Sequence, residues 1–233
     1  MAQQYVSFRG VSTASMTGII IAQMPSHRKA GQRYVEYKIP ARDGSLHMME
    51  GYEPFDTVCK LRLIKQDATA HQTINAWADG TGKLITSDDP SKCWQAMVRD
   101  EIVWTRDYAA GKFFDTANIV FHCQPFMHET TESTQTFAAT GNIINLGNVV
   151  SLPLIQVNGN GTCSLTVGGE EITLTGVVSG TPVFIDCDAA YVYTSAGMTT
   201  MTGHFPKIPL GTSQIVVGSG VTSLVITPRW GWV

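Results

Sequence analysis

The strongest group of side chains that could support chemistry is His122, Cys123 and His128. Imidazole nitrogens and thiolates are the ligands that zinc prefers. However, residues 112–123 alternate like a β-strand, and adjacent strand residues point to opposite faces, so His122 and Cys123 cannot easily share one ion. His128-Glu129 also lacks the second histidine of a zinc-protease helix. The pattern therefore favours a buried thiol beside a half-exposed histidine, and no metal site.

Two pairs of carboxylates are further candidates. Asp186 and Asp188 can face one side of a strand, but two carboxylates without other oxygen ligands bind Ca²⁺ poorly, so we interpret them as part of a strand-end turn. Asp88 and Asp89 precede a proline and are typical of a turn. The sequence has no nucleophile-elbow, phosphate-loop or dinucleotide-binding motif in a suitable context. It therefore predicts no catalytic residue and no cofactor, which argues against an enzyme.

Two tryptophans close the chain, Trp230 and Trp232. Aromatic side chains of this kind can form a platform on which sugar rings stack. Terminal aromatics more often pack onto their own domain or onto a neighbouring subunit. Both interpretations are compatible with the sequence.

Charge is distributed unevenly along the chain. Residues 1–127 hold 14 Lys/Arg and 13 Asp/Glu, whereas residues 128–233 hold 2 and 6. The second part lacks the clustered Lys/Arg that a nucleic-acid-binding surface needs. No apolar run is long enough to span a membrane. The five cysteines are widely spaced, which indicates free buried thiols in a protein made in a reducing cytoplasm.

The first part of the chain alternates mainly in the β period. Strands are predicted at 5–8, 17–24, 34–40, 57–65, 84–86, 93–98, 102–105 and 112–123. One helix is predicted over 68–78, with Asp67 as its N-cap. Asp43-Gly44 is typical of a tight hairpin turn. Pro125 is expected to end the last strand, because proline has no N–H for the ladder.

From residue 128 the composition becomes small and polar, and we expect two domains, 1–127 and 128–233. The second is predicted to be entirely β, with turns every 8–12 residues, as in a β-sandwich. Gly168-Gly169 predicts a two-residue hairpin. Its strands are predicted at 142–150, 153–158, 164–167, 171–174, 182–186, 190–193, 198–203, 213–217 and 223–227. The fold class is therefore mainly β, a sheet domain with one short helix followed by a sandwich.

Several stretches, in order, resemble a known family. IPARDGSLHMMEGYEPF (39–55), INAWADGTGKLITSDDP (74–90) and FHCQPF (121–126) look like the N-terminal domain of siphophage distal tail proteins. PLIQVNGNGTCSLTVGGEEITLTG (153–176), FIDCDAAYVY (184–193) and residues 203–230 are similar to that family's second domain. The resemblance extends over nearly the whole chain.

The resemblance implies a structural hub of a long non-contractile phage tail tip. The hub would be a ring of six copies that joins the tail tube to the tail-associated fibre or lysin protein and to receptor-binding components. DNA would pass through the central channel. The first domain would form the ring, and the second, a galectin-like sandwich, would project outward. We expect the ring interface to include Tyr52, Phe55, Arg42 and Asp43. The competing hypothesis is a carbohydrate-binding, lectin-like adsorption module.

Overall fold

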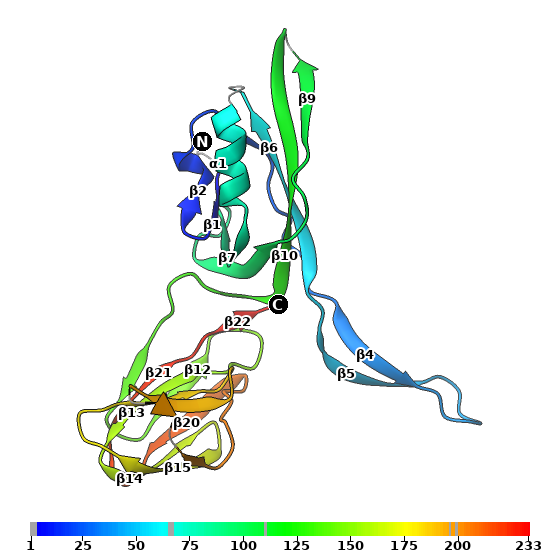
Figure 1. The fold of residues 1–233 in the computed structure, drawn as a ribbon. Coiled ribbons are helices and arrows are strands. Elements are labelled where there is room, and N and C mark those ends of the chain that lie inside the picture. Colours follow the sequence, from blue (N-terminus) through cyan, green and yellow to red (C-terminus); the bar gives the residue numbers. More distant parts are fainter. Residues whose placement is uncertain (1–3, 65–67, 110, 196, 199) are drawn as a thin grey trace. The chain divides into compact units, whose positions relative to one another are not determined.

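The computed structural model describes residues 4–64, 68–109, 111–195, 197–198 and 200–233 (Figure 1). Its contacts divide the chain into two compact units, Met1–Thr130 with Val233, and Thr131–Trp232. The division lies just after the predicted boundary at Met127. In the described residues the fold is mainly β with one α-helix, which confirms the predicted fold class.

A large antiparallel sheet forms the body of the first unit, with the order β2-β1-β7-β8-β10-β6-β3 and with β9 also paired to β10. The long strand β10 therefore lies between the β1–β2–β7–β8 half and the β6–β3 half. The strands are β1 (Val6–Phe8), β2 (Val11–Ser12), β3 (Ile19–Gln23), β6 (Phe55–Leu63), β7 (Gly80–Thr86), β8 (Lys92–Val98), β9 (Trp104–Ala109) and β10 (Lys112–Glu129).

The single α-helix, α1 (Ala68–Trp77), covers the inner face of this sheet. Its apolar residues Ile74 and Trp77 are buried. The Trp77 ring packs edge-on against Phe8 and Phe121, with ring centroids 6.1 and 6.3 Å apart. Such edge-to-face contacts stabilise a core beyond their buried area. The predicted helix is therefore confirmed, whereas the predicted N-cap, Asp67, lies outside the described residues.

The alternation of β10 is mostly as expected. Ile119, Phe121 and Cys123 are fully buried on the inner face. Phe113 shares that face by spacing but is 59% exposed, because β6 begins to pair with β10 only at Asp115. Asp115 itself is buried; its carboxylate lies 3.0 Å from Arg106 Nε and 3.1 Å from His71 Nε2. These contacts explain how a charged residue occupies the inner face.

The prediction that Pro125 ends this strand is wrong. β10 continues to Glu129, and its pairing with β8 is irregular between Cys123 and Met127. The β6 ladder has already ended at Cys123, opposite Phe55. The proline therefore lies where the ladder is interrupted and no N–H is required, as is usual at a bulge.

The second unit contains two sheets that enclose one core. One has the order β11-β21-β13-β16-β17-β18 and the other β12-β20-β14-β15-β19. Their strands are β11 (Gln135–Phe137), β12 (Gly141–Asn145), β13 (Leu154–Gly159), β14 (Gly161–Val167), β15 (Glu170–Val177), β16 (Val183–Asp186), β17 (Tyr191–Thr194), β18 (Gly197–Met198), β19 (Met201–Thr202), β20 (Gly211–Val217) and β21 (Val221–Thr227). The short β22 (Gly231–Trp232) follows.

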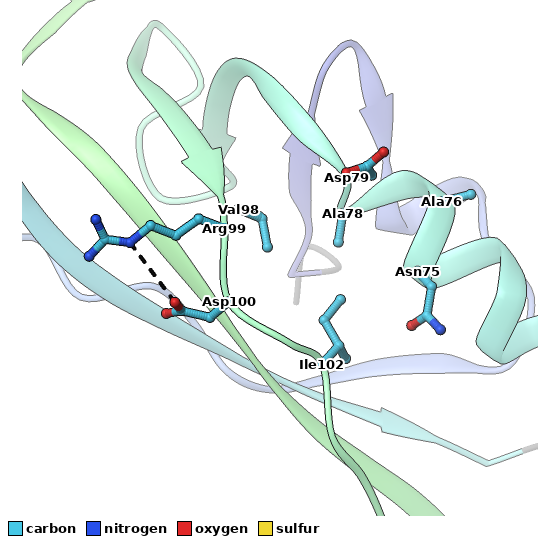
Figure 2. A pocket seen from close by; sticks show the side chains of 8 residues that line it. All are labelled: Asn75, Ala76, Ala78, Asp79, Val98, Arg99, Asp100 and Ile102. Atoms are coloured by element: carbon cyan, nitrogen blue, oxygen red, sulfur yellow. Dashed lines mark ion pairs between the residues drawn. The ribbon is translucent and has the colours of Figure 1, made fainter.

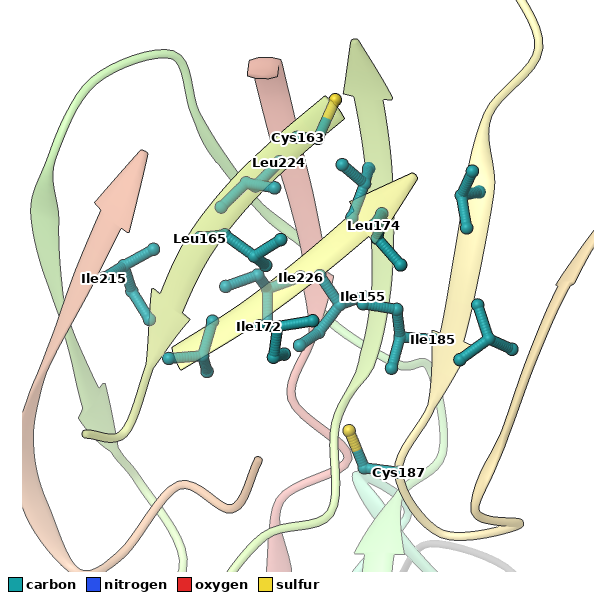
Figure 3. Close-up of a cluster of buried hydrophobic side chains, with 14 of the residues drawn as sticks. Ile155, Cys163, Leu165, Ile172, Leu174, Ile185, Cys187, Ile215, Leu224 and Ile226 are labelled. Carbon is teal, nitrogen blue, oxygen red and sulfur yellow. The ribbon is translucent and has the colours of Figure 1, made fainter. Parts of the chain in front are cut away.

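Apolar residues from both sheets meet in this core (Figure 3). Ile155, Leu165, Ile172 and Ile226 are at most 1% exposed, and β-branched side chains alternate inward along each strand. Trp230 is fully buried in the same cluster. Of the two interpretations of the terminal tryptophans, packing onto their own domain therefore holds for Trp230, and a sugar-stacking role for this side chain is excluded.

The turn between β14 and β15 has the predicted form. Val167 pairs with Glu170, which leaves Gly168 and Gly169 as a two-residue loop. Both glycines have positive φ, 60° and 91°, as a type I′ hairpin turn requires. A Cβ at Gly168 would also lie only 2.0 Å from the Lys207 carbonyl oxygen. This position therefore requires glycine for two reasons.

Candidate assembly interface

The predicted separation of His122 and Cys123 is confirmed. His122 Nδ1 lies 2.7 Å from Asp56 Oδ1 on the outer face of the first sheet. Cys123 is buried in the core, and burial raises the pKa of its thiol to about 12. All five cysteines are buried, and none of them forms a disulfide. In the described part of the chain, no three His, Cys, Asp or Glu side chains are placed to hold a metal ion.

Asp186 and Asp188 form a strand-end turn, as predicted. Arg229 binds both Asp186 carboxylate oxygens, at 2.8 and 2.9 Å. The same carboxylate accepts the backbone N–H groups of Asp188 and Ala189 at 3.1 Å. These bonds, chiefly those from Arg229, lower the pKa of Asp186. These four hydrogen bonds occupy the carboxylate oxygens of Asp186, so the side chain presents no open position to a metal ion.

A shallow hollow of about 340 Å³ lies beside the end of α1 (Figure 2). It is lined by Asn75, Ala76, Ala78, Asp79, Val98, Arg99, Asp100 and Ile102. Arg99 is paired with Asp100, with 3.9 Å between Arg99 Nε and Asp100 Oδ1. The lining contains no Ser, Thr, Cys or His side chain that could serve as nucleophile with a partnered base. The hollow therefore holds no nucleophile–histidine pair, and its carboxylates belong to Asp79 and to Asp100, which is paired with Arg99.

The feature of the first unit that most requires an explanation is an isolated hairpin. β4 (Gln32–Tyr37) and β5 (Leu46–Tyr52) pair only with each other, in a two-stranded sheet of their own. We call these strands with their connection, residues 32–52, the arm. Figure 1 shows it as a narrow ribbon leaving the end of β6. A two-stranded hairpin alone in water is at best marginally stable.

One face of the arm is apolar. Cross-strand partners share a face, and the register places Val35 opposite Met48 and Tyr37 opposite Leu46. Tyr37, Leu46 and Met48 are 50%, 44% and 51% exposed. We call these four residues the apolar arm face. Because the arm has no second layer, this face cannot be buried by the arm itself.

The opposite face of the arm is mixed. Tyr34 and Met49 lie there beside Glu36 and His47, and the Tyr34 and His47 rings are 5.3 Å apart. The His47 ring also bonds the Ser45 hydroxyl at 2.9 Å. The polar groups on this face can stay hydrated. The apolar arm face is therefore the one that we expect another protein surface to bury.

The root of the arm is fixed to the sheet. The Tyr52 ring packs edge-on against Phe126 of β10, with centroids 5.2 Å apart. The Phe55 ring contacts Trp94 at 6.2 Å, and Glu53 N–H donates to the Gly31 carbonyl at 2.8 Å. These contacts orient the ribbon where it leaves the sheet.

The four predicted interface residues therefore lie at the two ends of the arm. Arg42 and Asp43 are exposed in the connection at its tip, and Tyr52 and Phe55 lie at its root. The predicted tight turn is wrong: Tyr37 pairs with Leu46, so the connection spans residues 38–45, although Gly44 does adopt a positive φ of 76°. The sequence interpretation missed β5 and with it the apolar arm face. The available signal was the alternation of Leu46 and Met48, which Gly51 interrupts.

No protein-family model matches the sequence, and no curated protein matches it significantly. Among solved structures, the fold matches SPP1 Dit, with a TM-score of 0.78 and 12% identity over 100% of both chains. That protein is described as a paradigm of the hub adsorption apparatus in phages that infect Gram-positive bacteria. A second match, the phage P2 baseplate in its Ca-activated conformation, has a TM-score of 0.49 and 10% identity over 97% of both chains. The chain thus has the fold of SPP1 Dit.

Proposed function

We propose that the protein is a structural component of a long non-contractile phage tail tip. Six copies form a ring that joins the tail tube to the tail-associated fibre or lysin protein and to receptor-binding components. DNA passes through the central channel during infection. The protein is made in the cytoplasm of the host bacterium and becomes part of the virion. It has no enzymatic role and needs no cofactor.

The fold supports this proposal. The likeness to SPP1 Dit extends along the entire chain, so it includes both units and their order. A hub is a joining element, and the described residues, whose hollow beside α1 holds no nucleophile–histidine pair, suit that role. A fold alone does not determine function, so the proposal also needs a surface that can build an assembly.

The apolar arm face is the observation that carries the proposal. Val35, Tyr37, Leu46 and Met48 form a continuous apolar strip on a ribbon that has no other layer. Exposed strips of this kind mark interaction surfaces. In a cyclic ring each subunit uses two different patches, and an arm that reaches across to the next copy provides one of them.

Within this ring we assign the roles of the four predicted residues by their positions. Tyr52 and Phe55 hold the arm root against Phe126 and Trp94. Arg42 and Asp43, exposed at the tip, contact the neighbouring copy. The first unit forms the ring, and the second is a galectin-like sandwich that projects outward.

Native mass spectrometry of the full chain, with negative-stain imaging, tests the proposal. We expect hexamers, or two hexamers stacked, and ring-shaped particles with a central channel. Because some rings close only on a tail tube, the same measurement is repeated with tail tube protein of the same phage. A strict monomer at high concentration, both alone and with tail tube protein, would rule out the ring.

A second candidate function, a lectin-like adsorption module, is favoured by one cluster. Tyr191 is 40% exposed and its ring lies 5.1 Å from that of Tyr193, which stacks on Phe184 at 5.1 Å. Exposed aromatic rings provide surfaces on which sugars can stack. A host cell-wall polysaccharide array decides this point: binding that is lost in Tyr191→Ala supports the lectin, and no binding by the unmodified chain removes it.

A further inference from the structure

A second apolar surface lies on the sandwich, at the edge strand β12. The two sheets of the sandwich have four edge strands. β11 has three residues and β18 and β19 have two each, whereas β12 has five. Very short edges are a common way to prevent unwanted strand pairing, and β12 lacks this protection.

No charge protects β12 either. The sequence contains no charged residue between Glu132 and Glu170, which includes β12, and none between Lys207 and Arg229, which includes its neighbour β20. Natural edge strands usually carry a lysine, a proline or an inward charge that blocks further pairing. Within the described residues, β12 pairs with β20 on one side and with no strand on the other.

Apolar side chains gather at this edge. The ladder places Asn145 opposite Gly211, so Leu146 and Leu210 follow on facing chains. The Asn145 side-chain amide donates to the carbonyls of Val149, Ile208 and Pro209 at 3.0–3.3 Å, which ties both segments together. Ile144, Leu146, Val150 and Leu210 are 58%, 62%, 49% and 57% exposed. These four residues with the free side of β12 are called the β12 edge below.

We propose that the β12 edge is a docking site for an extended, uncharged segment of another protein, which adds to the five-stranded sheet as a further strand. The backbone of β12 supplies the hydrogen bonds. Ile144 of β12 and Leu146 just beyond it share the outer face of this strand and select a segment with apolar residues at alternate positions. This site goes beyond the proposed ring, because the arm of the first unit builds the ring.

Because the surface around β12 carries no charge, we expect the segment that binds it to be uncharged as well. A charged side chain brought against this edge would lose its hydration without gaining a counter-charge, which is costly. A second copy of this strand fits less well in the register that pairs all five residues. Full antiparallel pairing of two β12 strands, with Gly141 opposite Asn145, sets each Ile144 against Asn142 of the other copy. An apolar side chain would then face an amide.

A labelled synthetic peptide of alternating threonine and valine, N-methylated at every second residue, is the probe. The methyl groups block one edge of the peptide, so it cannot build extended sheets, and leave the other edge free to bond β12. Fluorescence polarisation with the full chain gives the dissociation constant. A peptide methylated at every residue cannot donate backbone hydrogen bonds and is expected not to bind.

Two matched variants locate the site. Ile144→Lys places a charge on the β12 edge, whereas Val178→Lys changes a residue that is 63% exposed and follows β15. We expect Ile144→Lys to weaken peptide binding by about tenfold or more and Val178→Lys to leave it unchanged. Leu146→Asn, just beyond β12, is the second edge variant if Ile144→Lys does not fold, as judged by thermal melting.

Three results overturn the proposal. The first is no peptide binding to the unmodified chain at about 1 mM. The second is equal binding by the edge variant and Val178→Lys. The third is loss of self-association in Ile144→Lys without peptide, which would identify a second copy as the occupant. Ring formation is read separately by native mass spectrometry, so a failure here does not count against the hub.

Discussion

Val35 of β4 lies directly opposite Met48 of β5, on the apolar arm face. Met49, the next residue, points to the opposite face, opposite Tyr34. The two methionines have the same exposure, 51%, and differ only in the face on which they lie. This pair therefore separates the effect of the apolar arm face from the effect of changing any exposed methionine.

Met48→Lys is expected to weaken assembly by about tenfold or more in dissociation constant, because a charge would be desolvated in the contact. Met49→Lys is expected to assemble normally. Both side chains are exposed in the single chain, so the melting temperature of the monomer is unchanged in both. Light scattering across a concentration series measures the assembly. Equal behaviour of the two variants would show that the apolar arm face is not the contact.

Gly168→Ala and Gly169→Ala form a second matched pair. Both have positive φ, but a Cβ at Gly168 would lie 2.0 Å from the Lys207 carbonyl oxygen, while a Cβ at Gly169 meets nothing within 4 Å. We expect Gly169→Ala to cost about 1 kcal/mol of unfolding free energy, from backbone strain alone. Gly168→Ala should cost about 3 kcal/mol, because the Lys207 segment must also move. Denaturant unfolding measures both, and equal costs would contradict the predicted close approach.

The Asp186 carboxylate should make the stability of the protein depend on pH. Its pKa is lowered in the folded state, chiefly by Arg229, so its contribution is present above the unfolded pKa of about 3.9 and is lost as pH falls through the lower folded pKa. Asp186→Asn leaves Arg229 without its charged partner, so we expect a loss of about 2–3 kcal/mol near neutral pH. The difference from the unmodified protein should shrink below about pH 4.

Thermal melting at several pH values checks this, with Asp188→Asn as the control. Asp188 is exposed, donates its backbone N–H to Asp186, and adds only a minor electrostatic attraction to Arg229. Its replacement should change both the stability and its pH dependence far less than Asp186→Asn. An Asp186→Asn curve parallel to that of the unmodified protein at every pH would show that the ion pair does not stabilise the fold.

The thiols provide a test of both cores. Burial raises the pKa of Cys59, Cys123 and Cys187 to about 12, and thiolate is the form that reacts with disulfide reagents. We expect none of the five cysteines to react with Ellman's reagent near pH 8 in the folded protein, and all five to react in guanidinium chloride. Rapid reaction of a native thiol would contradict the packing around it.

Much of the fold was predictable because burial alternates clearly along most strands. In β6, Cys59, Leu61 and Leu63 are fully buried, and their spacing alone indicated the inner face. The Gly168-Gly169 hairpin was predictable because only glycine adopts these φ values readily. These signals are local, and each can be read within a few residues of sequence.

The features of the fold that the sequence did not predict depend on contacts between segments that are distant in the chain. Nothing near Asp115 in sequence shows that Arg106 and His71 would compensate a buried carboxylate. Pro125 was misread because local rules do not show that the β6 ladder ends two residues earlier, at Cys123. In the arm, the strand predicted at 34–40 corresponds to β4, but β5 was missed because both faces of the arm are open, so Leu46 and Met48 lack the contrast between buried and solvated positions that marks ordinary strands.

The central place of β10 has a consequence for how the protein is made. The strands on its two sides, β8 and β6, come earlier in the chain and do not pair with each other. While the ribosome is still translating residues before Lys112, the nascent chain holds two incomplete half-sheets, each with an open edge. Emergence of β10 joins them in one step, so we expect the first unit to be most prone to aggregation and most dependent on chaperones just before that moment.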